Sequence, residues 1–248
     1  MARTSRRARR SSNFHLPGAF ELFNPSKELV LNNIWIFGPL YAVPFIFYVH
    51  SWIWSPLPHQ SIKWWQHSDK FSAGWTGSPL PTYGTFLVVG FSLLWLVIIA
   101  AVGTIVQIMS QRAQLDAVEH KTLDFQDLWK AVKELGWRML GLYVVMAVII
   151  FVGLILLVIP GLIMIRRYML APFIMLDEKT SIRESLDRSA ELSRLNTGAL
   201  WSVLGVMFLF GLVNIIPIIG GLASFALGSL YSLAPAMRYQ QLKRLAVQ

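Results

Sequence analysis

The chain has 248 residues, of which 55% are hydrophobic and 14% are charged, with a formal net charge of +9 and no cysteine. Soluble proteins carry about 25% charged residues, so this composition excludes an ordinary soluble domain and predicts an integral membrane protein. The missing thiols exclude disulfides, cysteine-ligated zinc and cysteine nucleophiles. The positive charges lie beside apolar runs, which favours membrane topology and anionic lipid, and no nucleic-acid partner is expected.

The N-terminal residues 1–13 contain five arginines and read as a disordered basic tail at the cytoplasmic face. A cleaved signal peptide fits poorly because the first apolar run begins only near Leu29. A twin-arginine export signal at Arg6-Arg7 fits poorly as well, since it lies too far from that run.

Residues 14–241 are predicted to form one polytopic, all-α membrane domain. Its six apolar runs predict transmembrane helices at about 29–50, 83–109, 139–159, 161–176, 199–214 and 218–237. The longest polar connection, 51–82, is rich in Trp, which prefers the membrane–water boundary. We therefore expect it to be an extracytoplasmic loop folded onto the outer leaflet.

A short amphipathic unit occurs three times, and each copy precedes a long apolar run. Ser189–Leu192 is echoed by Ser26–Leu29 and Val132–Leu135, and an acidic residue lies eight positions before each leucine. The pattern predicts three hairpins, each introduced by a cytoplasmic amphipathic interfacial helix. A second repeat relates Tyr168–Pro172 to Tyr231–Pro235, at the same end of two equivalent spans.

Capping residues mark the start of two of these interfacial helices. Asp124 is the expected N-cap of the helix at 125–136, and Ser181 with Glu184 forms a capping box before 182–195. On the latter helix one face is small and apolar, which suits packing against other helices, and the opposite face is charged. The packing face holds Ile182, Ser185, Leu186, Ser189, Ala190 and Ser193.

Lysine and arginine fall on one side of the predicted topology at nearly every connection. The opposite side holds only Lys63 and Lys70. The positive-inside rule therefore places both termini in the cytoplasm, with the chain as a multi-pass protein of the cytoplasmic membrane.

Arginines are the candidate binding residues for lipid phosphates or other anions. Arg166 and Arg167 lie inside the fourth predicted span, where charge is costly and often functional. The alternative is that they reach the head groups by snorkelling or form structural pairs. Arg183, Arg188 and Arg194 complete the candidate set on the charged face of the helix at 182–195.

A stripe of small residues runs along the sixth predicted span at intervals of four. Such a stripe permits close approach of membrane helices, either within the bundle or at a homodimer face. It consists of Gly220, Ser224, Gly228 and Ser232.

Metal binding and catalysis find little support in the sequence. His50, His59, His67 and Asp69 supply potential ligands, but their spacing matches no known site. There is no nucleophile–base arrangement, phosphate-binding glycine loop or HExxH motif. No metal, no cofactor and no enzymatic activity are therefore predicted.

Four features together resemble a known family: the segment FELFNPSKELVLNNIWIF, the Pro160-Gly161 pair, the run RRYMLAP and the helix that follows it. They are similar to the bacterial six-span family named as the membrane domain of glycerophosphoryl diester phosphodiesterases and its stand-alone uncharacterised relatives. The resemblance extends from Leu16 to Gln241. In fused members the catalysis belongs to a separate soluble barrel, so the resemblance implies a membrane domain without the enzyme and carries over no catalytic residue.

Two functions are compatible with these observations. The first is a non-catalytic membrane module that binds lipid, or that scaffolds a partner enzyme or a second copy at the inner leaflet. The second is a transporter or permease subunit for a small solute or lipid, which repeated hairpins and proline-broken spans also suit. Spans three, five and six lack the interior acids or bases that ion-coupled transport usually needs.

Overall fold

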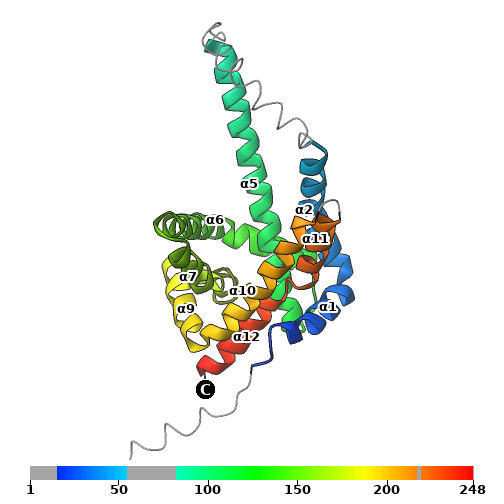
Figure 1. Ribbon diagram of the computed structural model, residues 1–248, viewed down its shortest axis with the longest axis vertical. Coiled ribbons are helices and arrows are strands. Elements are labelled where there is room, and N and C mark those ends of the chain that lie inside the picture. The colour runs from blue at the N-terminus through cyan, green and yellow to red at the C-terminus, as the bar shows by residue number, and fades with distance from the viewer. Residues whose placement is uncertain (1–15, 55–81, 217–218, 248) are drawn as a thin grey trace, which may run out of the picture.

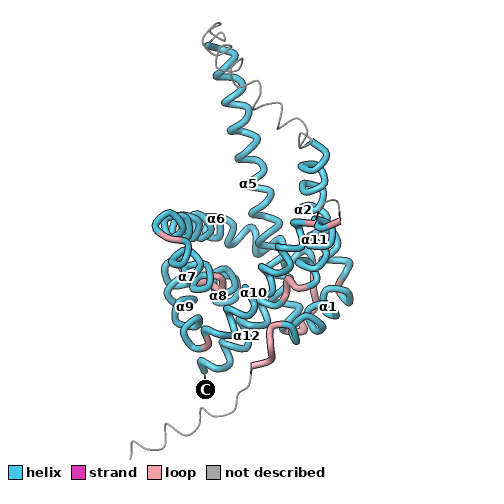
Figure 2. Tube along the Cα trace, in the orientation of Figure 1, coloured by secondary structure: helices cyan, strands magenta, loops and turns pink. Residues whose placement is uncertain are grey.

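The computed structural model describes residues 16–54, 82–216 and 219–247, and within these ranges the regular elements are all helices (Figure 2). Three helical stretches are long and apolar enough to cross a membrane: Phe125–Leu156, Val158–Glu178 and Thr197–Ile215. A bent pair, Phe20–Asn32 with Ile34–Phe47, would make a fourth. The all-α class is therefore confirmed for the described residues. The tail at 1–13 and the loop residues 55–81 lie outside them.

The first helical stretch bends sharply where the sequence predicts a continuous span. A short 3-10 helix, Phe20–Leu22, leads into α1 (Phe23–Asn32), and α2 (Ile34–Trp54) follows at an angle of 99°. Asn33 stands at the bend and donates its side-chain N–H to the carbonyl of Leu29 at 2.9 Å, which caps the end of α1. The span predicted at 29–50 therefore begins too early.

Two long helices each unite segments that the sequence analysis separates. Helix α5 (Thr82–Val118) contains the predicted span at 83–109 and the polar segment after it. Helix α6 (Phe125–Leu156) joins the predicted interfacial helix at 125–136 to the span at 139–159. The join is continuous because buried Leu135, Met139 and Leu142 extend one apolar face across it. Asp124 caps the start of α6 as expected, accepting from the backbone N–H of Gln126.

A tight hairpin connects α6 to α7 (Val158–Tyr168). The chain turns at Leu157, whose backbone is extended, and not at residue 160, where the predicted spans 139–159 and 161–176 meet. Pro160 stands third in α7, where its missing N–H leaves no intrahelical bond unmade. Gly161 faces Gly153 of α6, and a Cβ on Gly153 would lie 3.1 Å from the Cα of Gly161. Larger side chains would force the two helices apart.

The Tyr168–Pro172 and Tyr231–Pro235 repeats are helix breaks. Helix α7 ends at Tyr168 and α8 (Ala171–Glu178) begins three residues later; α11 (Gly220–Leu230) ends before Tyr231, and α12 (Ala234–Val247) follows. A proline ring clashes with the carbonyl four residues earlier, here that of Tyr168 or Tyr231. The span predicted at 218–237 is therefore interrupted, while α10 (Thr197–Leu212) holds most of the span at 199–214.

Serine hydroxyls satisfy a carbonyl beside each break. Ser189 of α9 (Ile182–Leu195) donates its Oγ–H to the carbonyl of Arg167 at 2.7 Å. Ser26 of α1 donates to the carbonyl of Leu230 at 2.6 Å. Both serines are fully buried, and each bonded carbonyl belongs to the residue just before the tyrosine of the repeat. The remaining amphipathic unit, second in chain order, has Val132 at the matching position, and α6, which carries it, packs against the unbroken α5.

The buried core lies at one end of the molecule. It combines α1, the first turns of α2, the second half of α5, the first half of α6, α8, α9, α10 and α12. The rest of α2 and the first half of α5 extend away from it (Figure 1). Ser185, Ser189 and Ser193 belong to this core, as the predicted packing face of α9 requires. Along the second half of α6, and on α7, α10 and α11, large apolar side chains stay exposed, as expected of surfaces that contact lipid.

Replacing Ser189 by Ala is expected to lower the free energy of unfolding by about 1–3 kcal/mol, because the carbonyl of Arg167 loses its buried donor. Ser26→Ala should lower the free energy of unfolding by a similar amount, because the carbonyl of Leu230 loses its buried donor. Exposed Ser202, which bonds only within its own helix, supplies the control variant Ser202→Ala. Denaturation of the purified protein in detergent measures all three, and equal stability of Ser189→Ala and Ser202→Ala would contradict the proposed role of the serine bond.

Candidate functional site

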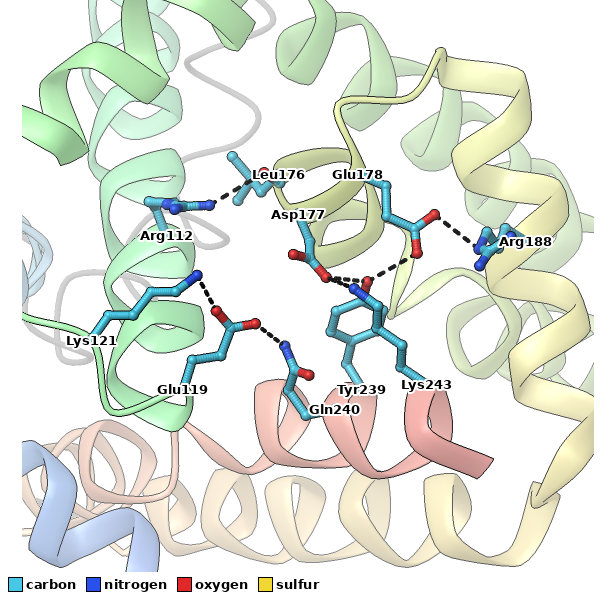
Figure 3. Close-up of polar contacts among 10 residues, drawn as sticks. All are labelled: Arg112, Glu119, Lys121, Leu176, Asp177, Glu178, Arg188, Tyr239, Gln240 and Lys243. Atoms are coloured by element: carbon cyan, nitrogen blue, oxygen red, sulfur yellow. Dashed lines mark hydrogen bonds and ion pairs between the residues drawn. The ribbon is translucent and has the colours of Figure 1, made fainter. Parts of the chain in front are cut away.

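Side chains at the ends of α5, α8, α9 and α12 meet in a polar cluster (Figure 3). Tyr239 of α12 donates its hydroxyl to Asp177 of α8 at 2.7 Å, and Lys243 forms an ion pair with the same carboxylate. Glu178 pairs with Arg188 of α9 at 2.9 Å. These contacts join three helices that come from distant parts of the sequence.

A second arm of the cluster joins α5 to α12. Gln240 donates to Glu119 at 2.6 Å, and Lys121 pairs with the same carboxylate. Burial and the neighbouring Asp177 raise the pKa of Tyr239 above its usual value, so the phenol stays a hydrogen-bond donor. Each acid in the cluster has a cationic partner, so the arrangement ties helix ends together and offers no free nucleophile or base.

The five predicted anion-binding arginines do not converge on one point. Arg166 and Arg167 occupy the last turn of α7, where the guanidinium of Arg166 lies 5.7 Å from the ring centroid of Trp201 and that of Arg167 lies 5.6 Å from the ring of Tyr168. The Nε–H groups of both are buried without a partner among the described residues. Arg188 pairs with Glu178, and Arg183 and Arg194 are exposed on α9.

A cavity of about 510 Å³ lies between α2, α5, α10 and α11, bordered by the α7–α8 break. One wall is a polar stripe on α5, with Gln107, Ser110, Gln111 and Gln114 at helical spacing. The other walls are largely apolar, with Leu40, Leu204 and Phe225 among them. Among the described residues, no charged side chain lines the cavity, so its interior suits a neutral molecule with polar and apolar parts.

Hydrogen bonds orient the polar groups of this cavity. Gln111 accepts from the hydroxyl of Tyr143 at 2.7 Å, and Gln114 donates to Ser110 at 3.2 Å. The hydroxyls of Tyr41 and Ser232 bond across the cavity mouth between α2 and the turn after α11. The polar stripe is thus held in place by neighbouring helices.

The predicted small-residue stripe serves two purposes in the structure. A Cβ on Gly220 would lie 2.2 Å from the carbonyl of Val213, so Gly220 permits a close turn between α10 and α11. Ser224, Gly228 and Ser232 instead line the cavity. A Cβ on Gly228 would meet open space, so close helix packing does not describe that position.

Sequence reasoning missed the cavity. The spacing of Gln107, Ser110, Gln111 and Gln114 (i, i+3, i+4 and i+7) is a visible signal of one polar helix face in an apolar run, but it does not reveal what that face meets. Of the histidine and aspartate set, His50 lies in α2, and His59, His67 and Asp69 lie outside the described residues. Among the residues that the structure describes, no group of acids and histidines is placed to hold a metal.

Comparison of the chain with protein-family models, curated proteins and solved structures gives no match. The candidate site is therefore interpreted from its own geometry.

Replacing Tyr239 by Phe is expected to lower the free energy of unfolding by about 1–3 kcal/mol, because Asp177 loses a buried hydrogen bond to a charged group. Tyr168→Phe is the matched control, since no hydrogen bond of its hydroxyl is found in the described part of the chain. Chemical denaturation in detergent compares the two variants. If both proteins unfold at the same denaturant concentration, the hydrogen bond from Tyr239 to Asp177 does not stabilise the fold, and the proposed role of the cluster is contradicted.

Proposed function

We propose that this chain is a multi-pass protein of the cytoplasmic membrane that binds lipid and has no catalytic role. In this proposal six spans form three hairpins, each introduced by an amphipathic helix at the inner leaflet. The observation that carries it is the central cavity, whose uncharged lining joins a polar stripe to apolar walls. Its volume lies within the range of about 300–1,000 Å³ that is usual for small-molecule sites.

The lining of the cavity suits one chemical class of occupant. Amide and hydroxyl groups of Gln107, Gln111 and Ser224 can bond ester or hydroxyl oxygens, while Leu204 and Phe225 can contact an acyl chain. A charged head group would find no partner inside the cavity. The part of a lipid that fits is therefore its glycerol–ester region with the beginning of an acyl chain, while a charged head group stays outside.

The two serine-bonded helix breaks support the three-unit arrangement. Ser189 lies in the third amphipathic unit and bonds a break in the second hairpin, whereas Ser26 lies in the first unit and bonds a break in the third hairpin. With α6 packed on α5, each unit contacts the hairpin before it, and the first contacts the last. Such a closed ring is what three copies of one unit would form, and it fits the proposed relationship to the phosphodiesterase membrane domain.

Basic residues near the buried end support the proposed orientation. Arg112, Lys121, Arg188 and Lys243 lie around the polar cluster (Figure 3), and exposed Arg183 and Arg194 add two basic side chains on α9. Lysine and arginine near an anionic leaflet each contribute about 1 kcal/mol of attraction. This end would therefore lie at the cytoplasmic leaflet, where a partner enzyme could be held beside bound lipid.

A permease subunit for a small neutral solute or a lipid is the second candidate. The same uncharged polar lining favours it, because hydroxyl and amide groups can pass a neutral molecule without ion coupling. Release of lipid from one leaflet to the other by the reconstituted protein alone would favour the permease, and stable retention would favour the binding module.

Filling the cavity is expected to abolish lipid retention. Gly228→Leu places an isobutyl group in the open space beside Gly228, and we expect at least a ~10-fold lower amount of co-purifying lipid by native mass spectrometry. Gly205→Leu is the matched control, because Gly205 on α10 is exposed and does not line the cavity. Equal lipid retention by the two folded variants would contradict the proposed site.

The orientation predicts the behaviour of reporters fused after Gln248. A reporter that works only in the cytoplasm should be active, and one that works only outside the cytoplasmic membrane should be silent. The reverse pattern would reject the proposed orientation while leaving the cavity argument intact.

A further inference from the structure

A second cavity, separate from the central one, is lined by a buried arginine and by the start of another helix. It has a volume of about 350 Å³ and shares no lining residue with the central cavity. Its walls are the segment at Leu16–Gly18, the first turn of α10 and Arg238 of α12. Helices α10 and α12 lie beside each other at this end of the molecule (Figure 1).

The charge of Arg238 is offset only at longer range, by the carboxylate of Glu21. The side chain of Arg238 is only 1% exposed. One terminal N–H donates to Gln241 at 2.8 Å and another to the carbonyl of Pro17, both of which are neutral, and its Nε–H has no partner. Among the described residues no carboxylate forms an ion pair with it.

Two nearby parts of the chain could have supplied that missing carboxylate. Glu21 is the acid nearest in sequence to Pro17, and its charge acts on Arg238 at longer range. Its carboxylate accepts from the N–H of Gly18, and no ion pair joins it to Arg238. Residues 1–15 contain no Asp or Glu. A buried arginine in such a position calls for an anion from outside the chain.

The first turn of α10 supplies the complementary half of an anion site. The side chain of Asn196 bonds the N–H of Ala199 at 3.0 Å, which leaves the N–H groups of Thr197 and Gly198 without an intrahelical acceptor. Gly198 lines the cavity without a side chain, so a ligand can approach the backbone closely. Helix N-termini of this kind favour phosphate, and a guanidinium can bond two phosphate oxygens at once.

We propose that Arg238 and the N-terminus of α10 bind a phosphate group, either free or as part of a phospholipid head group. This inference does not depend on the lipid-binding role of the central cavity, because the two sites share no residues. The site would hold a mono- or diester phosphate between the guanidinium of Arg238, only two of whose N–H groups are bonded, and the N–H of Gly198.

The experiment titrates the full chain, purified in detergent without phosphate, with inorganic phosphate while the unfolding temperature is recorded. A parallel arm measures retention of phosphatidylglycerol by native mass spectrometry. Phosphate should raise the unfolding temperature of the unaltered protein if free phosphate is the ligand. Retention of phosphatidylglycerol without a response to phosphate would assign the site to a lipid head group.

Two variants decide whether the response comes from this site. Arg238→Gln should weaken binding in whichever arm responds by at least ~10-fold. Gly198→Asp keeps Arg238 and adds a carboxylate where the phosphate would lie, at a helix position that favours acids. It should therefore raise the unfolding temperature without ligand and abolish binding, even if Arg238→Gln fails to fold.

Arg138→Gln is the matched control, because Arg138 is exposed on α6 and does not line this cavity. It should bind as the unaltered protein does. Binding by Gly198→Asp equal to that of Arg138→Gln, or no response of the unaltered protein in either arm, would overturn the proposal.

Discussion

The structure depends on one constraint: a backbone carbonyl that loses its helical partner in apolar surroundings must find another donor. Pro172 and Pro235 each break a helix, and a buried serine from a distant amphipathic helix bonds the carbonyl of Arg167 or Leu230. Where the chain has Val132 in place of a serine, the helix it packs on, α5, is unbroken. A helix break and a serine donor therefore occur together. The serine–carbonyl bonds determine where the amphipathic helices pack against the broken ones.

The breaks also separate two environments within single hairpins. Before the break, α7 and α11 expose large apolar side chains; after it, α8 and α12 are mostly buried and end in the polar cluster around Asp177 and Tyr239. Each break lies where an apolar run passes from an exposed apolar surface to the buried end of the molecule. The central cavity is bordered by both breaks. Its walls combine the polar stripe of α5 with apolar side chains of the neighbouring helices.

Local patterns predicted much of this fold, and tertiary contacts decided the rest. The caps at Asp124 and Ser181 are present as expected, accepting from the N–H groups of Gln126 and Glu184, because capping depends only on neighbouring residues. The repeat ending in Pro172 and Pro235 is visible as a pattern near the end of two predicted spans, but hydropathy alone does not predict that the helix breaks there. Similarly, nothing in the sequence separates the two parts of α6, because its apolar face continues through Met139. The cavity and the isolation of Arg238 could not be predicted, since both depend on which distant segments meet.

The most direct test of the account measures which helices contact lipid. The chain has no cysteine, so single cysteines can be introduced at exposed Val148 on α6 and Phe208 on α10, and at exposed Asp187 on α9. In protein reconstituted into lipid vesicles, a water-soluble thiol reagent applied to both faces should label the Asp187 position rapidly and leave the other two unlabelled. Labelling of the Val148 and Phe208 positions as fast as the Asp187 position would contradict the account.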